Sequence, residues 1–184
     1  HMAGGTLVSD LPGLDQLFEK DGLTVPKKIN RAVLVGTSRG PQDILTVEGG
    51  QKIRTTWGEM AWQLGGAEGF AMVAENDERG IAPGSNLLEA LFKKYSPSLI
   101  LIDEWVAYAR NLVDKSDLPA GTYDTQLTFA QQLTEATKQV ANALLLISVP
   151  QSINEIGGSN GELACNGLKN VVTRLPTLEA MKRL

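Results

Sequence analysis

The sequence predicts an α/β fold in which helices flank a parallel sheet in three layers. Two apolar runs, residues 99–102 and 144–147, have no polar alternation, which is typical of strands buried on both faces of a parallel sheet. Segments with helical periodicity separate these runs, and such alternation favours parallel strands joined by crossover helices. The 184 residues suffice for one domain with a sizeable core.

Capping residues, glycines and prolines bound the expected elements. The expected helices cover residues 9–22, 56–64, 83–94, 105–111, 124–142, 162–170 and 177–184. The expected strands cover residues 31–37, 99–103, 144–149 and 171–175. The charged residues of 67–82 predict a surface connection, and the glycine-rich residues 154–161 predict a loop.

The helix that begins near residue 56 has the most specific local signals. Thr56 with Glu59 three residues later predicts a capping box, and Gly65 with Gly66 predicts the end of this helix. We expect its tryptophans, Trp57 and Trp62, to pack against other side chains rather than bind a ligand.

Composition excludes several classes of site. His1, the only histidine, precedes Met2 and is interpreted as the remainder of a cleaved tag, with residues 1–5 as a cloning remnant. We therefore expect no histidine-based catalysis or metal site in the native protein. Cys165 is the only cysteine, which excludes an internal disulfide and a zinc cluster and fits a reducing cytoplasm. No apolar run has the length of a membrane span. The net charge of −4 argues against nucleic-acid binding by the chain as a whole.

Two adjacent carboxylates follow the apolar strand at residues 99–102. In open α/β sheets, ligands bind at the carboxyl ends of the strands. Asp103 can hold the hydrated Mg²⁺ that bridges nucleotide phosphates, and Glu104 can orient or deprotonate the attacking water. This is the Walker B pattern of nucleotide-hydrolysing proteins. The alternative is a buried strand that ends in two solvated acids.

The glycine-rich stretch Gly36-Thr37-Ser38-Arg39-Gly40 is not a phosphate-binding loop of the Walker A type. Such a loop needs Gly-Lys followed by Ser or Thr, and no Gly-Lys pair occurs in the sequence. The stretch is therefore expected to be an ordinary loop that follows a strand.

Together these segments resemble a bacterial family of large ATPases of the AAA+ type that is catalogued as a domain of unknown function. The resemblance is carried by residues 54–66, 82–84, 99–104, 148–152 and 155–158, and covers most of residues 7–175. It implies a P-loop NTPase-like core over residues 6–184, a fragment that lacks its first central strand and the Walker A loop. It also implies ATP and Mg²⁺ as cofactors of a longer parent protein, with an indirect link to DNA.

The resemblance also implies roles for individual residues. Asp103 would be the magnesium-associated acid and Glu104 the water-orienting acid. Ser148 or Ser152 would sense the terminal phosphate at the end of the next strand. Arg174 would lie where AAA+ proteins offer an arginine to a neighbour's phosphate; the alternative is a surface arginine at a strand end.

The sequence is compatible with three hypotheses of function. The first is the truncated ATPase core, which alone should bind no nucleotide tightly and should not hydrolyse ATP. The second is a non-catalytic interaction domain, and the third is part of a nucleic-acid helicase motor, which Trp105-Val106 after the acid pair disfavours. We expect strand 99–103 to lie between parallel neighbours 31–37 and 144–149. The unpaired edge of 144–149 should be filled by residues 171–175, by Thr6-Leu7-Val8, or by self-association with a second copy.

Overall fold

A three-stranded parallel sheet forms the centre of the computed structural model, which describes residues 28–150 and 156–172. The strands are β1 (Asn30–Val35), β4 (Ser98–Asp103) and β5 (Ala143–Ile147), in the order β1-β4-β5. β4 pairs in parallel with both neighbours, which confirms the prediction that the strand ending in Asp103 is central.

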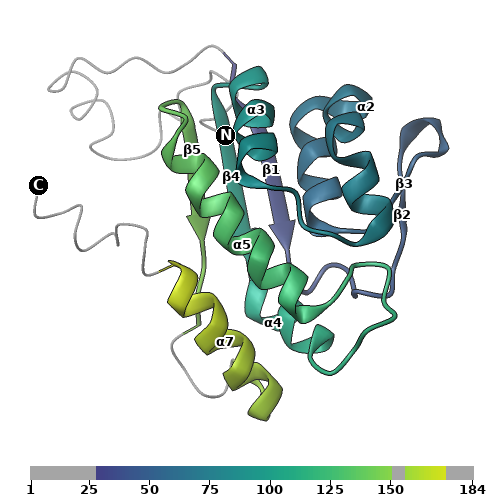
Figure 1. Cartoon of the computed structure of the whole chain (residues 1–184), viewed down its shortest axis with the longest axis vertical. Helices are drawn as coiled ribbons and strands as arrows, with labels where there is room; N and C mark the ends of the chain where they lie inside the picture. Colours follow the sequence, from purple (N-terminus) through teal and green to yellow (C-terminus); the bar gives the residue numbers. More distant parts are fainter. Residues whose placement is uncertain (1–27, 151–155, 173–184) are drawn as a thin grey trace, which may run out of the picture.

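Helices connect the strands and pack together along one side of the sheet (Figure 1). They are α2 (Thr56–Arg79), α3 (Ser85–Lys94), α4 (Trp105–Ala109), α5 (Tyr123–Lys138) and α7 (Gly158–Val172), with short 3-10 turns η2 (Glu48–Gly50) and η3 (Arg110–Leu112). The expected loop after β1 contains a small antiparallel hairpin of β2 (Leu45–Thr46) and β3 (Lys52–Ile53). The parallel sheet with packed helices is confirmed, whereas the third layer of the prediction is not found among the described residues.

Helix α2 does not end at its glycine pair, as the sequence suggested, but reverses there. Gly65 and Gly66 leave helical geometry, Gly66 with φ 57°, and residues 67–79 continue as helix. The prediction of a surface connection over 67–82 was wrong, because charged residues on one face of this second segment hid the buried Phe70, Val73 and Asp77 on the other.

The start of α2 also differs from the predicted capping box. The N-cap is Thr55, whose hydroxyl accepts the Gly58 N–H at 3.0 Å, one residue before the expected position. Thr56 instead pairs with the buried Gln126 of α5, and Glu59 forms an ion pair with Arg39. Tertiary partners thus redirected both side chains away from the local cap.

The sheet buries one face and leaves the other partly open. On β4, Ile100 and Ile102 are buried, whereas the alternating Leu99 and Leu101 are half-buried. β5 follows the same alternation, with Leu145 buried and its neighbours exposed. The expectation of strands buried on both faces is not met within the described residues, where α3, α4 and α5 cover a single face (Figure 1).

Two predictions near the end of the chain were wrong in part. Val171 and Val172 belong to helix α7 rather than to a strand, and Gly158–Gly161 begin that helix rather than continuing a loop. Helix α7 packs on α4 and α5, so its apolar residues serve a helix interface instead of the sheet. β5 lies at the edge of the described sheet. Thr6-Leu7-Val8 and residues 173–175 lie outside the described residues.

Candidate functional site

The three parallel strands end at the same edge of the sheet, the lower edge in Figure 1, and three of the predicted site residues lie at this edge. The Ser148 hydroxyl, just beyond β5, donates a hydrogen bond to Oδ1 of Asp103 at the end of β4. The same serine oxygen accepts the Glu104 N–H at 3.1 Å. Asp103 Oδ1 also accepts that N–H at 3.0 Å, so Ser148 holds the carboxylate of Asp103 and the backbone of Glu104.

Glu104 takes a backbone conformation that is uncommon for a residue other than glycine. Its φ of 51° and ψ of 34° lie in the left-handed region, which turns the chain sharply from β4 into α4. Gly36 at the end of β1 makes room for this turn, because a Cβ on it would lie 2.0 Å from the Glu104 carbonyl oxygen. Unusual backbone of this kind gathers at functional sites.

Thr37 is a site residue that the sequence argument left in an ordinary loop. Its hydroxyl donates a hydrogen bond to Oε2 of Glu104. The available signal was its place directly after a strand that pairs with β4, since parallel strands end at the same edge. Thr37 therefore holds the second acid as Ser148 holds the first.

A cavity of about 320 Å³ opens beside these groups. It is lined by Asp103, Glu104, Val106, Ala107, Ser148, Val149 and Pro150. Ligand pockets in proteins commonly start near this size, with mostly apolar walls and a few convergent polar groups. The cavity lies at the lower end of this size range, and its polar groups lie at the strand ends.

The loop after β1 is tied to α2 through Arg39. The Arg39 guanidinium lies 3.2 Å from the Glu59 carboxylate and donates to the Ile53 carbonyl at 3.2 Å. Tyr108, on α4 one turn after Glu104, packs near this ion pair. Burial raises the pKa of Tyr108 to about 12, against the opposing effect of the Arg39 charge. Arg39 thus ties the loop after β1 to helix α2 and to the hairpin strand β3.

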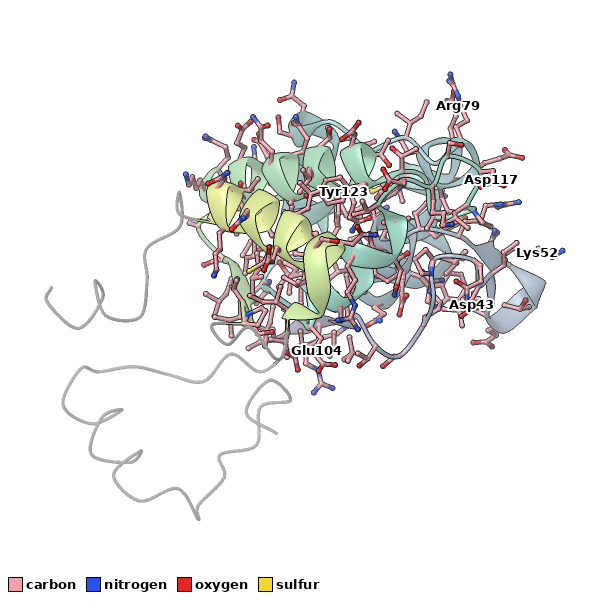
Figure 2. The ribbon with its side chains drawn as sticks, turned by 90° about the horizontal axis from the view of Figure 1, so that it is seen from below. Asp43, Lys52, Arg79, Glu104, Asp117 and Tyr123 are labelled. Carbon is pink, nitrogen blue, oxygen red and sulfur yellow. The ribbon has the colours of Figure 1, made fainter. Side chains whose placement is uncertain are left out.

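The remaining predicted site residues, Ser152 and Arg174, lie outside the described residues. Asp103, Glu104 and Ser148 are brought together as the sequence suggested. Figure 2 shows Glu104 at the rim of the molecule, well separated from Asp117 and Arg79.

The donor set limits how a metal could be held. In the part of the chain that the structure describes, no three His, Cys, Asp or Glu side chains gather as a metal site. Asp103 engages its neighbours through Oδ1. Mg²⁺ in nucleotide enzymes commonly takes one or two carboxylates and completes its shell with phosphate oxygens and water. The acid pair fits that mode and does not fit an all-protein cage.

A comparison with family models places the chain in a known family. The model described as the DUF499 N-terminal domain matches residues 23–181. The chain belongs to the DUF499 N-terminal domain family. This is a domain of unknown function, so membership leaves the chemistry of the acid pair unassigned. Searches of curated proteins and of solved structures found no match.

Within residues 28–150 and 156–172, no helix is long and apolar enough to cross a membrane.

Proposed function

We propose that this DUF499 N-terminal domain is part of a cytoplasmic ATPase core of the AAA+ type, in which Asp103 associates with Mg²⁺ and Glu104 orients the attacking water. The observation that carries the proposal is the position of the two acids at the carboxyl end of the central parallel strand, beside a cavity of about 320 Å³. Phosphoryl transfer depends on such positioning and on charge stabilisation rather than on covalent chemistry by the protein.

The hydrogen bonds around the acids support distinct roles. Ser148 and the Glu104 N–H both engage Oδ1 of Asp103, which fixes the orientation of that carboxylate toward the cavity. Glu104 is exposed and is held through its side chain only by Thr37 among the described residues, so its carboxylate can reach a water beside the phosphate. Mg²⁺ would neutralise phosphate charge when bound with ATP.

The chain by itself should be inactive. No Gly-Lys pair occurs in its sequence, so the amides and lysine of a Walker A loop are not provided. Each lost charge-assisted hydrogen bond is worth roughly 1.5–3 kcal/mol, and several are lost together. We therefore expect ATP affinity in the millimolar range or weaker.

The first experiment measures divalent-cation binding by this chain, with Mn²⁺ as a paramagnetic substitute for Mg²⁺. Weak binding, seen as a loss of free Mn²⁺ signal, should disappear in Asp103→Asn. Asp117→Asn is the matched control, because Asp117 is exposed and lies far from Glu104 in Figure 2. Equal binding by the two variants would remove the metal role of Asp103.

The second experiment measures magnesium-dependent phosphate release. Neither the chain nor Glu104→Gln should turn over ATP. The same substitution is then made in a DUF499 protein that carries a Gly-Lys-Ser or Gly-Lys-Thr loop. Replacing the glutamate that corresponds to Glu104 by glutamine should abolish ATP hydrolysis there and retain ATP binding. Undiminished hydrolysis in that variant would refute the role of Glu104.

A non-catalytic interaction domain is the second candidate, and one observation favours it. The second face of the sheet exposes large apolar side chains, which is a feature of interaction surfaces. Loss of Mn²⁺ binding in both Asp103→Asn and Asp117→Asn, or in neither, would favour this candidate over the ATPase core.

A further inference from the structure

The open face of the sheet gathers apolar side chains across all three strands. Val33 on β1 is 43% exposed, and Leu144 and Leu146 on β5 are 51% and 41% exposed. These are three of the six large hydrophobic side chains that are exposed in the described part of the chain. Between them lie the half-buried Leu99 and Leu101 of β4. The strand register places these five side chains next to one another on one face.

The two ends of this face carry opposite charges. Arg31 is exposed at the amino end of β1 and shares the face of Val33, because side chains two residues apart point the same way. Lys28 is exposed just before that strand. Asp103 and Glu104 lie at the carboxyl end. Since the three strands are parallel, the face has a positive end, an apolar middle and a negative end.

We propose that this open face, defined by Arg31, Val33, Leu101, Asp103, Leu144 and Leu146, binds the same face of a second copy of the chain. A two-fold axis that runs across the strands stacks the two sheets with their strands antiparallel. The Arg31 end of each copy then faces the Asp103 end of the other. Such self-complementarity is what a two-fold interface requires.

Charge selects this arrangement over the other stacked one. A two-fold axis along the strands would place both positive ends together and both negative ends together, which is unfavourable. Pairing through the β5 edges would leave Arg31 on the far side of each sheet, because β1 and β5 are opposite edges. Of these three two-fold arrangements, only antiparallel face-to-face stacking brings Arg31 near Asp103 of the other copy.

The size of the face sets the strength that we expect. Three strands about 4.8 Å apart and about six residues long present a face of roughly 10 Å by 17 Å between outer strand axes. Stable complexes bury about 800 Å² on each partner. The dimer is therefore weak and forms at high protein concentration, and it covers Asp103 when it forms.

The test is sedimentation velocity across about a hundredfold range of concentration, which should show a shift from monomer to dimer. Leu146→Glu should weaken dimerisation at least about tenfold, because it buries a carboxylate in the apolar middle. Leu163→Glu is the matched control: Leu163 is 51% exposed on α7, away from this face, and its substitution should leave dimerisation unchanged.

A charge swap tests the orientation. Arg31→Asp and Asp103→Lys should each weaken dimerisation about tenfold, and the double variant should restore it. Circular dichroism confirms that each variant is folded. A dimer that survives both single reversals would indicate edge pairing and overturn the proposal. A chain that is monomeric at every concentration would also overturn it. Slow thiol labelling of Leu146→Cys in that case would show that another part of the chain covers the face.

Discussion

Asp77 and Asp103 both accept backbone hydrogen bonds, but they differ in burial and in how many of their oxygens are bonded. Asp77 is fully buried and accepts the Thr55 N–H at 2.9 Å, the Thr55 hydroxyl at 2.6 Å and the Arg54 N–H at 3.1 Å. Its Oδ2 also lies 3.7 Å from the Arg54 guanidinium. Both oxygens of this carboxylate therefore bind the residues at the start of α2 and hold the second half of the helix against them.

Asp103 is half-exposed, and its described hydrogen bonds converge on one oxygen. The other oxygen has no donor among the described residues, and a cavity lies beside the carboxylate. The comparison shows that a carboxylate saturated by donors stabilises a fold, whereas one held by a single oxygen keeps capacity for a ligand.

Replacing each aspartate should give the largest contrast. Asp77→Ala leaves buried N–H groups without an acceptor, so we expect a loss of about 3–5 kcal/mol in the free energy of unfolding. Asp103→Ala should change it by no more than about 1 kcal/mol. Urea unfolding followed by tryptophan fluorescence measures both, and similar losses would erase the distinction.

The ionisation of Tyr108 at alkaline pH should lower the free energy of unfolding. The pKa of Tyr108 is raised to about 12 in the folded chain, above its ordinary value of 10.0. Tyrosine is neutral when protonated, so its contribution is complete below about pH 10 and is lost as the pH rises toward 12. The loss is of the order of 3 kcal/mol, since one pKa unit corresponds to about 1.4 kcal/mol.

Tyr108→Phe isolates this contribution from the lysines that titrate in the same range. The urea midpoint of the parent chain should fall relative to that of Tyr108→Phe as the pH rises from 10 toward 12, because only the parent chain has a tyrosine at this position to ionise. Parallel curves from pH 9 upward would mean that Tyr108 ionises freely in the folded state.

Gly58→Ala probes the contact that brings Asp77 against the start of α2. A Cβ at this position would lie 2.2 Å from Asp77 Oδ1 and 3.1 Å from an Ile53 methyl carbon. Overpacking of this kind costs about 1–3 kcal/mol. Gly84→Ala is the control, since nothing lies within 4 Å of its Cβ position and its φ is −69°. Equal urea midpoints for the two variants would contradict the tight contact.

Thr37→Val should have the smallest effect on stability. The hydroxyl and the Glu104 carboxylate that it contacts are both exposed, so water can replace the lost hydrogen bond. We expect a change below about 1 kcal/mol in urea unfolding, and Thr37→Ser should match the parent chain. A loss above about 2 kcal/mol would assign this contact to the fold rather than to the site.

The sequence by itself determined the central strand, its parallel neighbours and the convergence of Asp103, Glu104 and Ser148. Apolar runs without alternation and periodic helices are local patterns, and parallel strands necessarily end at one edge. The same patterns located α3, α4 and most of α5, because capping residues and glycines bound those helices within a few residues.

Only the tertiary structure decided which distant side chains contact these elements. Asp77 is buried because the chain reverses at Gly65 and Gly66 and brings residues 67–79 back to the start of α2. Its partner Thr55 is 22 residues away, too far for a local sequence pattern to indicate the contact. Thr37 reached Glu104 from 67 residues away. The open face arose because the described helices cover one side of the sheet, and apolar composition alone does not say which side a neighbour covers. The local pattern therefore located Asp103 at the end of its strand, whereas long-range packing made Asp77 a structural aspartate.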